Sequence, residues 1–373
     1  MKALKSLILK LFLVQICLIF LQAQICFWPI VNAWAREDTV PGSRYTSARG
    51  AAMGDAFLPL GDDGASALFY NPAIFGKLSK TQAEPLNLAM YLNSGFTQML
   101  SAKSTSATSL SSYYDHLLNN RGIYSSEGFS FLPAYSLPGF GFGFLMQAHL
   151  GAIGNEDGSI RYRSNYQMIP AFGGGVRLAG GIIRLGYSAQ WVNQASGNIT
   201  TATPVGYNQQ LAQGSALSHN MGATITFPTE YLPSLNVVAR NVLGAHFSSF
   251  SIFPLARNPV GVPPDEPMTL DASFSLQFKM GSGSVMHLVF EDRDITNTSG
   301  VPQIGRLAIG TELNIRDVFL LRGGWGSGYP SMGFALKKKN GEFSITWYNE
   351  DVGTSYHSLK DTRYLLQYQV RVF

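Results

Sequence analysis

Apolar and polar residues alternate along much of the chain with a period of two. In residues 140 to 150, large apolar side chains fall on one side and small or polar ones on the other. The apolar set is Phe140, Phe142, Phe144, Met146, Ala148 and Leu150, and the opposing set is Gly141, Gly143, Gln147 and His149. Successive side chains of a strand point to opposite faces, whereas a helix would scatter these residues around its circumference. The pattern therefore predicts a β-strand with one apolar face.

The same alternation predicts fourteen strands over the whole chain. They lie near residues 86 to 93, 129 to 137, 140 to 150, 160 to 178, 182 to 195, 216 to 227, 233 to 242, 267 to 280, 284 to 293, 304 to 314, 318 to 325, 329 to 338, 341 to 349 and 362 to 373. The segment 160 to 178 is long enough to form two strands. Repeated one-sided strands indicate an all-β protein, either a transmembrane barrel or a soluble β-sandwich.

Short and long connections largely alternate between these strands. Tight turns are expected at 138 to 139, 179 to 181, 281 to 283, 316 to 317 and 339 to 340, and long loops at 94 to 128, 196 to 215, 243 to 266 and 350 to 361. Bacterial barrels have short periplasmic turns and longer outer loops. The rhythm therefore favours an antiparallel transmembrane barrel with an even strand number and both termini in the periplasm.

The first 35 residues have the features of a secretory signal peptide. Three lysines precede an apolar stretch from Leu11 to Leu21, and small residues occupy the cleavage positions at Ala33 and Ala35. We expect the mature chain to begin at Arg36. A retained anchor helix is the alternative, but lysine and glutamine residues interrupt the apolar run before it reaches the roughly 20 residues that a span needs. Lipidation at Cys26 fits less well, because the bulky Ile25 precedes it.

Composition supports a membrane barrel. Charged residues make up 13% of the chain, about half the ~25% of a soluble domain, yet no apolar run beyond the leader is long enough for a transmembrane helix. Both cysteines, Cys17 and Cys26, lie in the leader, which excludes disulfides and cysteine chemistry from the mature chain. The mature charge is close to neutral, which does not indicate nucleic-acid binding. The six histidines lie far apart, so no metal site is predicted. The sequence has no Gly-x-Ser-x-Gly motif and no phosphate-binding loop, so no cofactor or catalytic site is predicted.

The last residues resemble the C-terminal aromatic strand by which barrel insertion machinery recognises outer-membrane proteins. The chain ends in Phe373, after an alternating apolar set, Tyr364, Leu366, Tyr368, Val370 and Val372. Phe373 falls on the polar side of that alternation. Either the strand bulges near its end or Phe373 lies beyond it.

Residues 47 to 78 do not have the pattern of a strand. Their sequence is SARGAAMGDAFLPLGDDGASALFYNPAIFGKL. Asp63 is placed to accept from free amides of a short helix beginning at Gly64. Asn71 is placed in the same way before Pro72, whose missing N–H costs nothing at a first helical position. Such caps satisfy backbone amides where water is scarce.

This segment resembles the N-terminal plug, or hatch, of the FadL long-chain fatty acid transporter superfamily and its PorV-type relatives. The matching pieces are Ala48 to Gly54, the acidic pair Asp62 and Asp63 ahead of Ala65 to Ala67, and Asn71-Pro72-Ala73. The resemblance implies a barrel of about fourteen strands, residues 86 to 373, closed by a small plug within residues 36 to 85. It also implies the outer membrane of a Gram-negative bacterium.

By the same resemblance, the leading hypothesis is passive uptake of hydrophobic, fatty-acid-like molecules through a lipid-embedded barrel. The candidate ligand and plug residues are Arg49, Phe57, Asp62, Asp63, Leu68, Phe69, Tyr70, Asn71, Pro72, Ala73, Gly141 and Gly143. The apolar ones either contact ligand or pack the plug against the wall, and the two glycines leave room for a kinked wall.

Two other classes of function remain open. A PorV-like barrel would bind secreted proteins through its outer loops. The segment 94 to 128 carries Tyr113, Tyr114, Leu117 and Leu118 at helical spacing, which suits either a ligand-capturing helix or a partner surface. An outer-membrane enzyme is the third class, although no nucleophile and base stand at motif spacing.

Overall fold

The predicted strands are present in the structure, a computed structural model that describes residues 44 to 372 except 62, 102–109, 204–205, 207, 282 and 354–356. The strands are β1 (Gln82–Asn93), β2 (Tyr124–Phe131), β3 (Ala134–Leu137), β4 (Phe140–Gly154), β5 (Ile160–Leu178), β6 (Ile183–Thr201), β7 (Ala212–Thr226), β8 (Ser234–Arg240), β9 (Thr269–Lys279), β10 (Val285–Asp292), β11 (Leu307–Ile315), β12 (Phe319–Gly326), β13 (Tyr329–Lys338), β14 (Gly341–Asp351) and β15 (Lys360–Val372). The segment 160 to 178 forms one strand rather than two.

The strands close into a single antiparallel barrel. Strands that follow one another in sequence pair, except β2 with β3, and β15 pairs with β1 to complete the wall. Both β2 and β3 pair with β1 and with β4. These two short strands therefore share one position in the wall, separated by Leu132 and Pro133. The closed barrel has fourteen strand positions, as the alternation predicts.

The wall has an apolar outer face and a polar inner face. Large exposed side chains include Phe142, Phe172, Met221, Met332 and Leu366. The alternate positions are buried and mostly polar, among them Gln147, Gln190, Glu312, Arg322 and Gln367. A closed sheet leaves no unpaired edge, and its apolar exterior matches lipid. The chain is a transmembrane β-barrel of the outer membrane. Among the described residues, no helix is long and apolar enough to cross a membrane.

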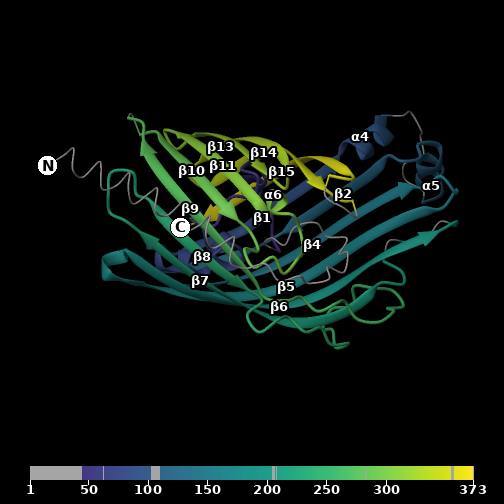
Figure 1. Ribbon diagram of the computed structural model, residues 1–373, viewed down its shortest axis with the longest axis horizontal. Helices are drawn as coiled ribbons and strands as arrows, with labels where there is room; N and C mark the ends of the chain where they lie inside the picture. Colours follow the sequence, from purple (N-terminus) through teal and green to yellow (C-terminus); the bar gives the residue numbers. More distant parts are fainter. Residues whose placement is uncertain are drawn as a thin grey trace.

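The ends of the barrel differ as predicted, although the lengths of the loops change. The loop expected at 196 to 215 is shorter, because β6 continues to Thr201 and β7 begins at Ala212. The loop expected at 94 to 128 ends sooner, because β2 begins at Tyr124. In Figure 1, β4 and β5 extend toward the end that carries helices α4 (Ser94–Ser101) and α5 (Leu110–Asn119).

The residues before β1 form what we call the inner segment, residues 44 to 81, which lies within the barrel. It contains α2 (Ala48–Ala52), α3 (Gly64–Phe69) and the 3₁₀ helix η1 (Pro72–Gly76). Helix α2 packs on β12 to β15, α3 on β3 to β5, and η1 on β5 to β7. The inner segment therefore reaches opposite parts of the wall.

Three of the sequence predictions fall outside the described residues. These are the signal peptide with its cleavage site, residues 1 to 36, the plug residue Asp62 and the terminal Phe373. Strand β15 stays in register with β14 up to Val370. The irregularity near the end of the chain lies instead in β1, between Ala83 and Leu86, opposite Val370 and Val372. Short connecting helices, η2 (Ala179–Gly181) and α6 (Gln303–Arg306), complete the fold.

Candidate functional site

Both predicted helix caps are present in the inner segment. The Asp63 carboxylate accepts a hydrogen bond of 2.6 Å from the Ser66 amide at the start of α3. The Asn71 Oδ1 accepts one of 3.0 Å from the Ala73 amide, with Pro72 at the first position of η1. Asn71 is fully buried, and its Nδ2 also donates to the Leu58 carbonyl at 3.1 Å. One side chain thus ties two turns of the inner segment together.

Arg49 joins the inner segment to a buried charge network in the wall. Its Nε and Nη2 donate to the two carboxylate oxygens of Glu312 at 2.7 and 2.6 Å. Arg322 donates to Glu312 at 2.8 Å and to Glu342 at 2.7 Å. Two guanidinium groups therefore balance two carboxylates away from water, and the bidentate geometry holds α2 in one orientation. We call these four residues the charge network.

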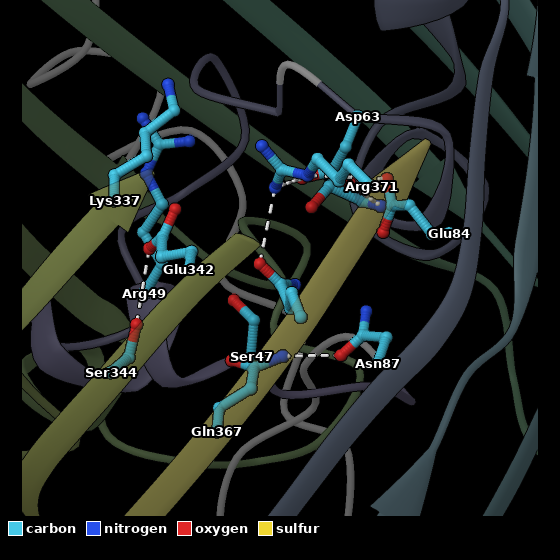
Figure 2. Close-up of polar contacts among 12 residues, drawn as sticks. Ser47, Arg49, Asp63, Glu84, Asn87, Lys337, Glu342, Ser344, Gln367 and Arg371 are labelled. Carbon is cyan, nitrogen blue, oxygen red and sulfur yellow. Dashed lines mark hydrogen bonds and ion pairs between the residues drawn. The ribbon is translucent and has the colours of Figure 1, made fainter. Parts of the chain in front are cut away.

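Asp63 makes a second link between the inner segment and the wall. Arg371 on β15 donates to its free carboxylate oxygen at 3.2 Å, and the Nε of Arg371 lies 3.8 Å from Glu84 on β1. Figure 2 shows these three side chains together, with Gln367 bonded to Asn87 beside them. Asp62, the other half of the acidic pair, lies outside the described residues.

Wall side chains also satisfy the backbone of the inner segment. Glu291 on β10 accepts from the amides of Phe57 and Leu58 at 3.0 and 3.2 Å. Arg240 on β8 donates to the carbonyls of Phe69 and Tyr70, at 2.9 and 3.2 Å. These carbonyls end α3, where helical partners are missing. Sequence reasoning missed both wall residues, although each is a charged residue on the inward side of a predicted strand.

The four apolar candidates of the inner segment have different surroundings. Phe57 and Tyr70 pack edge-to-face at 4.8 Å, within the segment. The Tyr70 hydroxyl donates to Asp55 at 3.1 Å, and burial raises the pKa of Asp55 although Arg293 nearby lowers it. Phe69 borders a cavity on the loop side. Leu68 faces the wall at β4.

Gly141 and Gly143 do not kink the wall, contrary to the sequence interpretation. Strand β4 pairs without interruption through both residues with β3 and β5. A Cβ at Gly141 would lie 2.6 Å from the Phe75 ring, and one at Gly143 would lie 2.9 Å from Leu68. The two glycines therefore make room for side chains of the inner segment rather than for a bend.

Other inward glycines, missed from the sequence, allow closer approach of the two backbones. A Cβ at Gly186 on β6 would lie 2.2 Å from the Pro72 carbonyl carbon. One at Gly324 on β12 would lie 2.1 Å from the Met53 carbonyl carbon. Such contacts leave no space for any side chain. Their signal in the sequence is a glycine at an inward position of an alternating strand.

Helix α5 forms where the tyrosine and leucine spacing predicts it. The buried side chains that the structure describes on this helix face the wall. Tyr114 and Leu117 are buried against Ala152, Ile160 and Tyr162 at the ends of β4 and β5. Leu118 packs partly against the same cluster. This face of α5 is therefore not free to capture ligand or a partner. The side chain of Tyr113 is outside the described part.

Two cavities of different character occur in the described part of the barrel. A polar one of about 420 Å³ lies inside the barrel and is lined by Arg44, Asp55, Gln147, His149, Arg240 and Glu266, among others. An apolar one of about 610 Å³ lies on the lipid-facing side of the wall. We call it the wall groove, and its lining is Ala83, Glu84, Pro85, Pro133, Ala134, Tyr135, Phe142, Gly143, Phe144, Pro170, Ala171, Phe172, Trp191 and Leu217. No group of three potential metal ligands occurs among the residues described.

Solved structures with a similar arrangement include outer-membrane transporters and an enzyme. The Pseudomonas putida toluene transporter TodX is 11% identical, with 90% of this chain and 98% of that chain covered and a TM-score of 0.47. A Pseudomonas aeruginosa FadL homologue is 10% identical, with 90% and 99% covered and a TM-score of 0.47. Outer membrane phospholipase A from Escherichia coli is 12% identical, with 87% and 98% covered and a TM-score of 0.30.

Sequence comparisons add no relative. No protein-family model matches the chain, and no curated protein matches it. At these identities and TM-scores, the structural similarity assigns this chain neither a family nor an activity.

Proposed function

We propose that the protein is an outer-membrane channel for passive passage of hydrophobic small molecules of the fatty-acid or hydrocarbon class. The observation that carries the proposal is the wall groove, an apolar hollow that lies directly outside Leu68 of the inner segment. In this proposal the inner segment is the plug, and ligand passes between the barrel interior and the membrane through the wall. The resemblance of residues 47 to 78 to the FadL hatch agrees with that substrate class.

Interruptions in strand pairing line up beside the wall groove. Pro85 lies in the irregular part of β1, Pro133 separates β2 from β3, and Pro170 lies where the pairing of β5 with β6 is broken. Phe144 on β4 connects the last two, since it pairs with Pro170 and its amide donates to the Pro133 carbonyl. Proline cannot donate a backbone hydrogen bond, so the wall has fewer bonds here to break.

Apolar side chains continue from the wall groove into the barrel. Leu132, Leu145 and Ile169 are fully buried and belong to one cluster with Leu68 and Phe69. A hydrophobic molecule moving inward from the groove would exchange one apolar contact for another. Passage along the barrel axis would instead cross the polar cavity, where an apolar ligand leaves polar groups without partners. The lateral route therefore has the smaller barrier.

The proposal is tested by measuring uptake of laurate and of toluene by a deletion strain that carries the protein or a variant. Pro170→Val gives β5 a donor for β6, so we expect slower uptake of both compounds. Pro330→Val is the matched control, because Pro330 lies in the unbroken pairing of β12 with β13. Asn71→Ala, which removes the cap and the link to Leu58, is expected to change uptake through the plug.

Uptake is read against the amount of folded barrel in the outer membrane. Equal uptake in the deletion strain and the complemented strain would end the proposal. Co-purification of secreted proteins in that case would favour the PorV-like alternative, and release of fatty acid from acyl substrates would favour an enzyme. The signal peptide and recognition of Phe373 by the insertion machinery remain predictions beside this one.

A further inference from the structure

A segment of the loop between β8 and β9 runs from the interior apolar cluster, against which Phe247 packs, to the lipid-facing side of the wall. We call residues 247 to 262 the flap. The amide of Ile252 donates to the Asn193 Oδ1 at 3.3 Å, and Ser215 Oγ donates to the Phe250 carbonyl at 2.7 Å. Asn193 and Ser215 pair with each other, two residues along from the pair of Trp191 and Leu217. Residues two apart share a face, so the flap is bonded to outward side chains.

Backbone pairing fixes the flap on β7. Strand β8 ends at Arg240, where the outer half of β7 has no strand beside it. Ser248 takes that place, exchanging hydrogen bonds with Ser215 at 3.0 and 2.9 Å. Further on, Val260 donates to the Leu211 carbonyl at 2.9 Å. The flap is therefore an ordered extension of the wall.

The flap lies where the apolar outer face of β6 ends. Trp191 is exposed on that face. The next outward residues, Asn193 and Ala195, are fully buried. Phe250 packs on Trp191, with ring centroids 6.4 Å apart. Phe253 packs on Phe144 of the wall groove, at 5.8 Å.

Much of the surface that the flap turns outward is apolar, although Ser248, Ser249, Arg257 and Asn258 are also exposed. Phe250 is 60% exposed, Val260 is 64% exposed and Ile252 is 48% exposed. Among its sixteen residues the one charged side chain is Arg257. Exposed apolar side chains of this kind are costly in water. This surface is continuous with the lipid-facing wall, which identifies lipid as the material that covers it.

We propose that the flap is embedded in the outer leaflet of the membrane, with Phe250, Ile252 and Val260 among the lipid chains. The flap then borders the wall groove on its extracellular side, where Phe250 and Phe253 contact two groove residues. This inference rests on the outward contacts of the loop and does not depend on the proposed transport.

The test uses single cysteines at Phe250 and Val260, in the full chain with Cys17 and Cys26 replaced by serine. Each cysteine carries a nitroxide spin label, and the protein is placed in phosphatidylcholine vesicles. Collisions with oxygen, which concentrates in lipid, are compared with collisions with a water-soluble nickel chelate. We expect both sites to favour oxygen, as a lipid-facing label does.

Two further single-cysteine variants provide reference collision rates, one for the lipid-facing wall and one for a turn. Met221→Cys marks the lipid-facing wall, and Ser327→Cys marks the tight turn between β12 and β13. In gel electrophoresis without heating, all four variants must migrate as folded barrels. Labels on the flap that collide with the nickel chelate as often as the label at position 327 would overturn the proposal. Shielding from both reagents would also overturn it, since a second copy of the chain would then cover the flap.

Discussion

Arg322 lies between two carboxylates at the centre of the charge network. Its side chain and those of Glu312 and Glu342 are almost completely buried. Removing one member of a buried ion pair leaves an uncompensated charge, which costs about 3–5 kcal/mol. We expect Arg322→Met to lower the free energy of unfolding by that amount, measured by guanidinium unfolding in detergent micelles.

Lys337→Met is the control for this change. Lys337 also forms an ion pair, with Asp317 at 2.7 Å, but both partners are partly or largely exposed. Exposed pairs contribute about 0–1 kcal/mol, so this variant should unfold almost as the parent does. Equal losses in the two variants would contradict a special role for the charge network.

His246 and Asp265 form an exposed pair beside the flap. The hydrogen bond and charge of Asp265 raise the pKa of His246 above its ordinary value, and His246 lowers the pKa of Asp265. The hydrogen bond therefore contributes fully to folding stability below the unfolded pKa of histidine, about 6.5. Its contribution is lost as pH rises through the folded-state pKa of His246. An NMR titration should give a lower His246 pKa in Asp265→Asn. An unchanged value would show that the pair does not form.

At the scale of elements, the tightest contacts are between inward glycines and the inner segment. Gly324→Ala would push a methyl group into the Met53 carbonyl of the inner segment, and we expect a loss of about 1–3 kcal/mol from overpacking. Because the inner segment must shift, the variant should also conduct more ions across planar bilayers. The neighbouring Gly323→Ala places its methyl 3.9 Å from Thr311. This control variant should match the parent in stability and in ion conductance. Equal stability and conductance of the two variants would contradict the proposed contact.

The elements could be predicted because their signals are local. Alternation fixes which residues of a strand share a face, so β5 was expected with the bounds that the structure has. The caps at Asp63 and Asn71 were equally readable, since a cap and its helix are adjacent in sequence. The exact ends of long strands were missed, as in β6 and β7, because outside the lipid their pairing continues without an apolar signal.

The contacts between elements could not be read in this way. Glu291 meets Phe57 across more than two hundred residues, and no local pattern records that meeting. Gly141 illustrates the same limit, since its inward position was predicted but the ring of Phe75 that fills the space was not. The flap had no signal at all, because a loop's sequence does not say on which side of a wall it folds.

At the scale of the whole molecule, the barrel is uneven around its circumference. Strands β4 to β7 have 15 to 19 residues, whereas β8 to β13 have 7 to 11. The flap lies on the long strands, and the wall groove extends from them across β3 to β1. The proposed exchange of hydrophobic ligand with the membrane would therefore take place on one side of the barrel.

The ion pair between Asp63 and Arg371 constrains the order in which the fold can form. Asp63 precedes every strand, and Arg371 belongs to the final one. The ribosome makes the first partner more than three hundred residues before the second. During export and insertion, this one contact of the inner segment therefore cannot form until the last strand is in place.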